Sequence, residues 1–185
     1  MGHNLRIIII LISMALLPQN SLATEEAQMI TTKYFGRIDI DWEMEVEIRS
    51  EIEINNRKSS CLLMIEPDVK VTDELSKRID NLSEFDQTAR NFFDENGNDG
   101  LIGWFIKHHI ETFENEIANS LGVTGELTHS KFLNVLKIEQ VVVQMSEMNE
   151  VLFIVDYSIG TEISNDILVV SFHMNGEIKE LMHES

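Results

Sequence analysis

The fold is decided by one stretch of the sequence, residues 37–54, which reads RIDIDWEMEVEIRSEIEI. Apolar side chains take nearly every second position, and charged side chains take most of the positions between them. A period of two is typical of a β-strand with one buried face and one solvated face. At about 3.3 Å per residue, a straight strand of this length would run roughly 60 Å, too long for one small domain. We therefore expect a turn or sharp bend near Asp41-Trp42.

The chain is expected to turn back at Asn55-Asn56, because asparagine tolerates the positive φ angles of a tight loop. Such a loop sets three pairs opposite one another: Ile52 with Ser59, Ile48 with Leu63, and Val46 with Ile65. The apolar face of the first strand then continues into the second, which supports this hairpin. The single cysteine, Cys61, lies on that face, so we predict a buried structural thiol and no intramolecular disulfide.

The middle of the chain changes to apolar residues at three- and four-residue steps, which predicts helices. Thr72 is the expected N-cap of the first helix, which ends at the NGNDG segment, residues 96–100. A second helix is expected from near Gly100 toward Asn119, and a short third helix over residues 130–136.

The last third returns to strand patterns, which we place at residues 140–145, 151–159, 167–174 and 177–182. The last two strands flank Asn175-Gly176, normally the signal of a two-residue loop. That loop would set Leu168 opposite His183 and Phe172 opposite Lys179. A three-residue loop, 174–176, with Gly176 in the left-handed position of a bulge, instead pairs Phe172 with Ile178 and Leu168 with Met182. We expect the three-residue loop, because it keeps one face apolar.

The order of elements is therefore strands, helices, strands, without the alternation of a parallel α/β protein. We predict an α+β fold, in which N-terminal and C-terminal strands form an antiparallel sheet and two or three helices pack on one face. No internal repeat or linker divides residues 34–185, which we treat as one domain.

The first residues predict a secretory signal peptide over residues 1–23. A polar start with Arg6 precedes an apolar run over residues 7–17, and Ser21-Leu22-Ala23 supplies small residues for cleavage. The run is about half the roughly 20 apolar residues that a membrane span needs. We expect an exported protein, periplasmic or extracellular, without a membrane anchor, whose mature chain starts with a flexible segment, residues 24–33.

The chain is strongly acidic, with a net charge of −18. Such a surface repels nucleic acid and anionic membranes, and it favours a basic protein partner or cations. We predict a partner-binding stripe formed by the acidic residues of the opening stretch, namely Asp39, Asp41, Glu43, Glu45, Glu47, Glu51 and Glu53. The alternative is the solvated side of a sheet, where charge keeps strand edges from aggregating.

Other candidate sites are weaker. Residues 94–100, DENGNDG, have the composition of a calcium loop, but neither possible register supplies the glutamate at position twelve. His108 and His109 are adjacent on a helix and point about 100° apart, so they do not form a chelating pair. Ser158 is not in a nucleophile elbow, and no phosphate-binding or dinucleotide-binding glycine motif occurs. We therefore predict no catalytic residue, no metal site, no cofactor and no enzyme activity.

The C-terminal sequence resembles a bacterial family of uncharacterised α+β domains. The resemblance rests on DYSIGTEI at residues 156–163, LVVSF at 168–172, NGEI at 175–178 and the terminal MHES, with FDQTAR at 85–90 and IKHH at 106–109. It covers most of residues 33–185, but His183 interrupts the terminal Met-Glu-Ser, and the family is mainly associated with chains that lack an export signal. The family has no established activity, so the resemblance assigns no catalytic residue.

These observations lead to three expectations about function. The first is a non-enzymatic envelope protein that binds another protein, in the manner of an immunity protein that neutralises a toxin. The second is a cation-binding or ligand-binding module built on the loop at residues 94–99. The third is an unrecognised hydrolase, which a cavity with converging polar residues would favour.

Overall fold

The computed structural model describes residues 28–40, 43–122, 126–146 and 150–185. The predicted signal peptide, Asp41 and the bend expected at Asp41-Trp42 lie outside these residues. Eight strands and four helices follow one another as β1 (Gln28–Thr32), β2 (Gly36–Ile40), β3 (Val46–Ile54), β4 (Arg57–Ile65), α1 (Asp73–Asp80), α2 (Leu82–Asn96), α3 (Gly100–Leu121), α4 (His129–Leu133), β5 (Lys137–Met145), β6 (Val151–Ser158), β7 (Ile167–His173) and β8 (Ile178–Glu184). The α+β class is confirmed.

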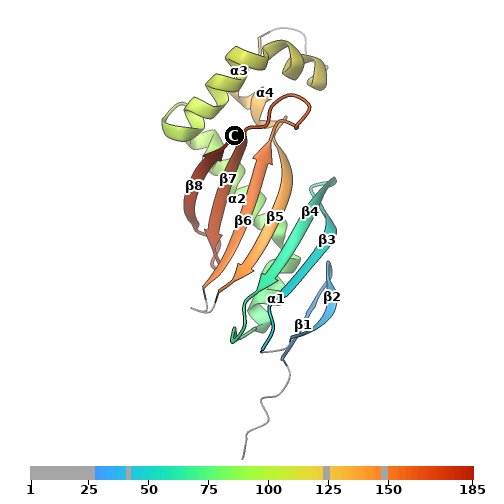
Figure 1. The fold of residues 1–185 in the computed structure, drawn as a ribbon. Coiled ribbons are helices and arrows are strands. Elements are labelled where there is room, and N and C mark those ends of the chain that lie inside the picture. Colours follow the sequence, from blue (N-terminus) through green and yellow to red (C-terminus); the bar gives the residue numbers. More distant parts are fainter. Residues whose placement is uncertain (1–27, 41–42, 123–125, 147–149) are drawn as a thin grey trace, which may run out of the picture.

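The main sheet has six strands in the order β3-β4-β5-β6-β7-β8, which is also their order in the sequence (Figure 1). The prediction of an antiparallel sheet is wrong for one pair, because β4 and β5 run parallel. A hairpin forces antiparallel neighbours, but the long helical connection between β4 and β5 lets the chain return to the starting edge of the sheet. This parallel pair joins the N-terminal hairpin to the C-terminal strands.

The β3–β4 hairpin has the predicted register. Ile52 pairs with Ser59, Ile48 with Leu63, and Val46 with Ile65. Asn55 and Asn56 both have positive φ angles, 52° and 62°, which is the conformation of the tight turn inferred from the sequence.

The stretch at residues 37–54 divides into two strands that belong to different sheets. β2 pairs with β1 in a separate two-stranded sheet, with Ile30 opposite Ile38. Of the segment predicted to be flexible, residues 24–33, residues 28–32 form strand β1, while residues 24–27 lie outside the described residues. Ile30, Ile38 and Ile40 are buried in the core, and this burial holds the segment as a strand.

The helices lie close to the predicted ranges, with two differences. Thr72 caps α1 through its side chain, as predicted. The first predicted helix is divided at Asn81, whose φ angle of −116° interrupts it and whose side-chain amide donates to the carbonyl of Lys77. The third helix was predicted over residues 130–136, but it ends at Leu133, before the predicted end at residue 136.

The β7–β8 hairpin confirms part of the prediction and corrects the rest. Phe172 pairs with Ile178, and Gly176 has a positive φ angle of 90°, as the three-residue loop requires. The predicted pair of Leu168 with Met182 is wrong, because Leu168 pairs with His183. The register shifts between Ser171 and Phe172, so Lys179 is an extra residue in β8 that moves the rest of the strand by one position.

The core forms between α2 and the sheet, and α2 lies behind the sheet in the view of Figure 1. The Phe85 ring of α2 stacks on Phe153 at 4.3 Å between centroids and meets Phe172 edge-on at 5.3 Å. About two turns further along α2, Phe93 meets Tyr157 edge-on at 5.2 Å. These rings mark the sides of β6 and β7 that face the core.

Candidate functional site

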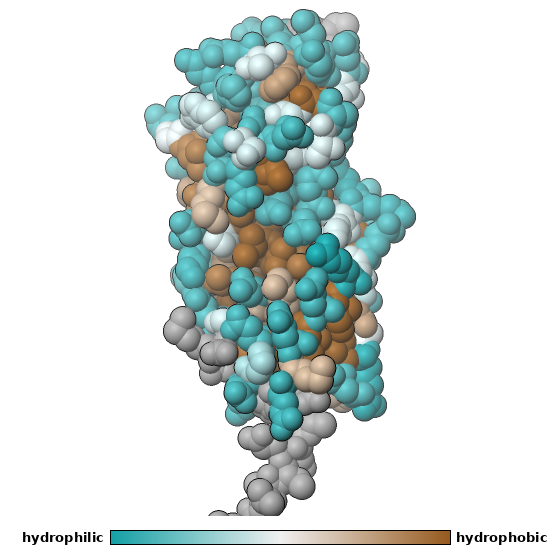
Figure 2. Space-filling view, in the orientation of Figure 1, coloured by the Kyte–Doolittle hydropathy of each residue, from teal (hydrophilic) through white to brown (hydrophobic). Residues whose placement is uncertain are grey.

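The side of the main sheet turned away from the core, which we call the outer face, carries its own apolar group. The strand registers place Leu62, Val142 and Ile154 in one row across β4, β5 and β6. Further apolar residues of this face are Met64, Leu152, Ile167, Val169 and Met182. None of the eight belongs to the core cluster, although Leu62 and Val169 are buried by their neighbours on the sheet. Figure 2 shows apolar residues gathered over the middle of the sheet, among hydrophilic ones.

Acidic side chains border this apolar group at both edges of the sheet. Edge strand β3 contributes Glu47, Glu51 and Glu53, all exposed. Edge strand β8 contributes Glu180 and Glu184, which the register places opposite Ser171 and Ile167. Basic groups are fewer on this face, and they are paired. Lys58 Nζ lies 2.6 Å from Glu51 Oε1, and an Arg49 Nη lies 3.4 Å from Glu47 Oε1.

One carboxyl group lies inside the apolar group instead of at its edge. Asp156 is on β6, paired with Val169 on one side and Gln140 on the other. Partial burial and, as the smaller cause, the charge of Glu184 together raise the pKa of Asp156 to about 6. A carboxylate that is poorly solvated and near a second carboxylate is a favourable place for an incoming cationic side chain.

The predicted acidic stripe does not form a single surface in the described residues. Glu47, Glu51 and Glu53 share the outer face of β3, but Asp39 lies on β2 in the other sheet, paired with Arg37 at 3.0 Å. Glu43 and Glu45 are exposed in the connection between β2 and β3. Asp41 lies outside the described residues. The alternation of residues 37–54 predicts one charged face. The chain changes sheets after Ile40, so these charged residues belong to two different sheets.

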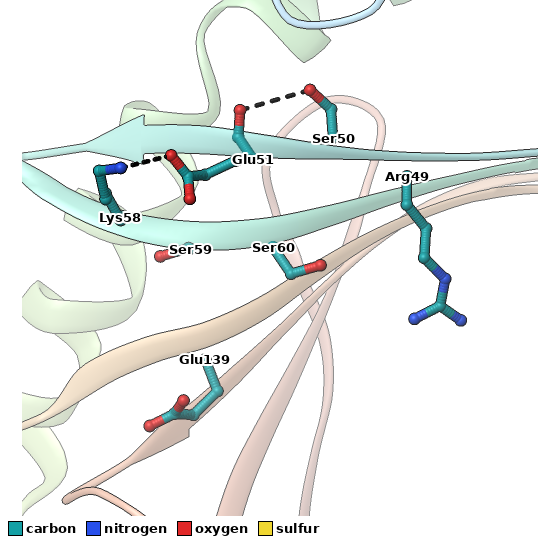
Figure 3. A pocket seen from close by; sticks show the side chains of 7 residues that line it. All are labelled: Arg49, Ser50, Glu51, Lys58, Ser59, Ser60 and Glu139. Atoms are coloured by element: carbon teal, nitrogen blue, oxygen red, sulfur yellow. Dashed lines mark hydrogen bonds and ion pairs between the residues drawn. The ribbon is translucent and has the colours of Figure 1, made fainter.

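An open depression of about 460 Å³ lies at the β3 side of the sheet, where β4 and β5 begin to separate. Figure 3 shows the side chains that line it, among them Arg49, Lys58 and Glu139. The lining carries both signs of charge. Glu139 is the extra residue at an irregularity of β5, and its carboxylate accepts a hydrogen bond from Ser158 Oγ at 2.5 Å. The depression extends the outer face toward its acidic edge.

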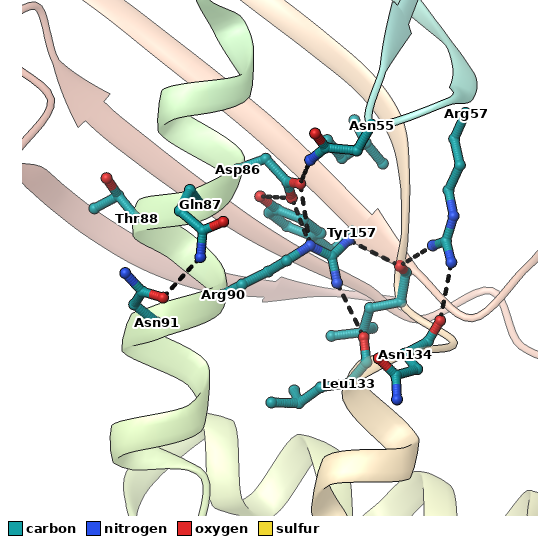
Figure 4. Close-up of polar contacts among 12 residues, drawn as sticks. Asn55, Arg57, Asp86, Gln87, Thr88, Arg90, Asn91, Leu133, Asn134 and Tyr157 are labelled. Carbon is teal, nitrogen blue, oxygen red and sulfur yellow. Dashed lines mark hydrogen bonds and ion pairs between the residues drawn. The ribbon is translucent and has the colours of Figure 1, made fainter.

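A second cavity, of about 230 Å³, contains the converging polar residues that would favour a hydrolase. Its lining includes Asp86 of α2, which is 1% exposed. Asp86 accepts hydrogen bonds from Asn55 Nδ2 at 2.6 Å, Arg90 Nε at 2.9 Å and Tyr157 Oη at 3.1 Å (Figure 4). Desolvation by full burial, together with the charge of Asp86, raises the pKa of Tyr157. Asp86 thus has three protein partners, and the group joins α2, β6 and the β3–β4 turn.

The arginines of this second cavity are also used structurally. Arg90 donates to the carbonyl oxygens of Leu133 and Leu136, at 3.0 and 3.1 Å. Arg57 donates to the carbonyl oxygens of Leu136 and Asn134, at 2.8 and 3.1 Å. These bonds satisfy backbone groups at the turn between α4 and β5, so the network contributes to the stability of the fold.

The remaining predicted features have structural roles. The Cys61 thiol is fully buried and its pKa is raised to about 12 by that burial, as expected of a structural cysteine. The supposed calcium loop is partly helical, since Asp94 and Glu95 lie in α2, and Asp99 is the N-cap residue of α3. Gly97 lies against the imidazole of His129, and a Cβ at Gly97 would come within 1.4 Å of that ring.

A cluster of three histidines and one aspartate lies at the end of the sheet near α3. Asp166, in the connection before β7, has carboxylate oxygens 3.0 Å from His183 Nε2, 3.5 Å from His109 Nε2 and 3.7 Å from His108 Nε2. We call these four residues the histidine cluster. His109 is fully buried, whereas His108 is 40% exposed. Sequence reasoning found His108 and His109 but missed their partners, which are far away in the sequence.

The outer apolar group was also missed, although the sequence contains a signal for it. Residues 141–143, 151–155 and 167–170 are uninterrupted apolar runs. Such runs are typical of strands that bury both faces, whereas a half-exposed strand alternates. The C-terminal strands therefore present apolar side chains on the core side and on the outer side alike.

Comparison with known proteins identifies no relative of this chain. The sequence matches no protein-family model, no curated protein and no solved structure. Among the described residues, no helix is both long enough and apolar enough to span a bilayer.

Proposed function

We propose that this protein is a non-enzymatic, immunity-type domain that binds a basic protein partner through the outer face of its main sheet. The observation that supports the proposal best is the arrangement of that face, an apolar centre with a carboxyl group inside it and acidic edges around it. Protein interfaces commonly combine an apolar centre with a polar rim, and exposed apolar patches mark interaction sites.

The proposal includes the arrangement of the two layers, in which the helices cover one face of the sheet and leave the outer face to the partner. Burial of the six outer apolar residues that are still partly exposed would then supply the affinity, at about 25 cal/mol per Å² of apolar surface removed from water. The partner is expected to be basic because the chain has a net charge of −18 and glutamates occupy both edges of the face. Opposite charge would accelerate the encounter and fix the orientation of the partner.

Compartment and family enter as part of the same proposal. We propose that residues 1–23 are a cleaved export signal, so that the protein meets its partner in the periplasm or outside the cell. Membership of the bacterial family of uncharacterised domains rests on the C-terminal sequence resemblance. Detection of the uncleaved chain in the cytosol of the native host would contradict the proposed compartment.

Binding through the outer face is tested with one substitution on that face and a matched one elsewhere. Met182→Arg places a positive charge at an exposed position of the β8 edge, where Met182 is 39% exposed. Met29→Arg makes the same chemical change on β1, where Met29 is 51% exposed and belongs to the other sheet. Both changes are at surface positions and should alter stability by less than about 0.5 kcal/mol.

The partner is sought by photo-crosslinking in the native host, with the reactive residue at Ile154 in the centre of the outer face. We expect a basic exported protein to be crosslinked there and not from Trp104, an exposed residue of α3. Met182→Arg should weaken its binding at least tenfold, a loss of about 1.4 kcal/mol, and Met29→Arg should leave it unchanged. Equal weakening by both substitutions would argue against the outer face.

The immunity role has a separate test. Deletion of the gene should make the host sensitive to a toxin encoded next to it, and the Met182→Arg variant should restore less protection than the Met29→Arg variant. A deletion strain that resists the product of each neighbouring toxin gene would contradict this role while leaving the binding face open to other partners.

A further inference from the structure

Two arginine side chains lie side by side in the second cavity, of about 230 Å³, which we now call the arginine cavity. The carbonyl oxygen of Leu136 accepts hydrogen bonds from both, at 2.8 Å from Arg57 and 3.1 Å from Arg90 (Figure 4). One shared acceptor therefore holds two guanidinium groups next to each other. A carbonyl oxygen is uncharged, so it orients the two cations without cancelling their charge.

The lining of the arginine cavity has one more positive than negative charge. It contains the two guanidinium groups and a single carboxylate, that of Asp86, which lies 2.9 Å from Arg90. Arg57 forms no ion pair with a carboxylate of the described residues, since its hydrogen bonds go to the carbonyl oxygens of Leu136 and Asn134. This is so although the chain has 32 acidic and only 14 basic residues. An anion from outside the chain would supply the missing partner.

The arginine cavity also has the donors and the apolar walls that suit a bound carboxylate. Arg57 uses two of its N–H groups in the bonds to carbonyl oxygens, while the planar fork of a guanidinium presents more donors than these and matches the geometry of a carboxylate. Beside the guanidinium groups, the lining includes the apolar side chains of Ile54 and Ile138. A ligand with a charged head and an apolar tail would contact both kinds of wall.

We propose that the arginine cavity binds a small monocarboxylate, whose carboxylate pairs with Arg57 and whose apolar chain lies against Ile54 and Ile138. A carboxylate and a guanidinium form two parallel, charge-assisted hydrogen bonds, which would fix the orientation of the ligand. The cavity volume of about 230 Å³ is below the roughly 300–1,000 Å³ of sites for drug-sized ligands, so the apolar chain is short.

The charges of the cavity favour a ligand with a single negative charge. One negative charge makes the lining neutral, whereas the second charge of a phosphate dianion would face the carboxylate of Asp86 without a cation to match it. The net charge of −18 also opposes a dianion more than a monoanion, although salt screens charges that lie more than about 10 Å away. An uncharged analogue of the same shape would leave the charge of Arg57 unmatched.

The arginine cavity is separate from the outer face, so this inference does not rest on the proposed function. Arg57 alternates along β4 with the same parity as Cys61, whose side chain belongs to the core, and it therefore points away from the outer face. Arg90 is on α2, which packs on the core side of the sheet. Ligand binding is thus a property of the free protein.

The test is an NMR titration of the purified protein at pH 7.0 and constant ionic strength, with butyrate as the probe. Butyramide, which has the same shape without the charge, and phosphate are the comparison compounds. We expect butyrate to shift the Nε–H signal of Arg90 and the backbone amide signals of Arg57 and Ile138 saturably, with a dissociation constant on the order of 1–10 mM. Butyramide should bind at least about tenfold more weakly, and phosphate at least about threefold more weakly.

Variants test the role of Arg57. Arg57→Gln removes the unmatched charge and keeps a side-chain amide, and it should weaken butyrate binding at least about tenfold. Arg49→Gln is the matched control, because Arg49 lines the other depression and lies 3.4 Å from Glu47, and it should leave butyrate binding unchanged. If Arg57→Gln does not fold, Arg57→Lys decides in its place. It keeps the charge and loses the planar fork, so we expect butyrate to bind at least about threefold more weakly.

The absence of a saturable shift with butyrate up to about 50 mM would overturn the proposal, as would equal binding of butyrate and butyramide. Tighter binding of phosphate than of butyrate would overturn the proposed class of ligand. Equal weakening by the Arg57 and Arg49 substitutions would show that Arg57 does not hold the carboxylate. No protein partner is needed for these measurements, so the carboxylate site and the proposed function can fail independently.

Discussion

Replacing Asp86 by alanine should remove a large part of the stability of this domain. The carboxylate is 1% exposed, and it accepts from Asn55, Arg90 and Tyr157. Its removal leaves the guanidinium of Arg90 without its anion, and this side chain is only 25% exposed. It also leaves the fully buried hydroxyl of Tyr157 without its acceptor.

Breaking a buried ion pair from one side costs about 3–5 kcal/mol, and a domain has only about 5–15 kcal/mol of stability in total. We therefore expect Asp86→Ala to lower the free energy of unfolding by about 3–5 kcal/mol in urea denaturation followed by far-UV circular dichroism. Glu84→Ala is the matched control, since Glu84 is on the same helix and its contact with Arg78 is exposed. That control should cost about 0–1 kcal/mol. A loss below about 1 kcal/mol for Asp86→Ala would refute the structural role assigned to the network.

Three further predictions concern single positions. Gly97→Ala should destabilise the protein by about 1–3 kcal/mol in the same denaturation assay, because the new methyl group would overlap the His129 ring; stability equal to that of the unmodified protein would contradict this packing. Asp156→Asn should stabilise the protein at pH 7 by about 1 kcal/mol, after allowance for solvent exposure, because the raised pKa of about 6 makes stability fall as pH rises from about 4 to 6. The two proteins should have equal stability near pH 4, and a difference that persists there would show another cause. Cys61 should not react with a thiol reagent at pH 8 until the protein unfolds, because burial keeps its thiol protonated, and rapid reaction of the native protein would contradict its burial.

The parts of the fold that were predictable are those fixed by local chemistry. The β3–β4 register follows from strict alternation and from two asparagines that accept positive φ angles, so no distant contact was needed to infer it. The parallel pairing of β4 and β5 was not predictable in this way. This pairing depends on the position at which the long helical connection returns the chain to the sheet. That position depends on core contacts such as those of Phe85 with Phe153 and Phe172.

The observed β8 differs from the predicted one by a single extra residue, and both the outer face and the histidine cluster depend on that residue. Without the extra residue Lys179, a strand that starts with Ile178 opposite Phe172 would turn Glu180 and Met182 toward the core. With Lys179 as a bulge, Leu181 faces the core instead, and His183 turns toward Asp166. The sequence favours such a bulge only through the balance of burying Leu181 and solvating Glu180, which depends on neighbouring strands.

Acidic residues at sheet edges have an ordinary explanation, since charge on an edge strand prevents edge-to-edge pairing between copies. This explanation covers Glu47, Glu51 and Glu53 on β3 and Glu180 on β8. It does not cover Asp156, which lies on β6, two strands from the β8 edge and three strands from the β3 edge, and whose neighbours on the outer face include Val169. An uncharged side chain at this interior position would leave the edges as they are, and the raised pKa of Asp156 predicts that it would make the protein more stable at pH 7. Under the proposed function, a cationic group of the partner would pair with this carboxylate and offset its cost in stability.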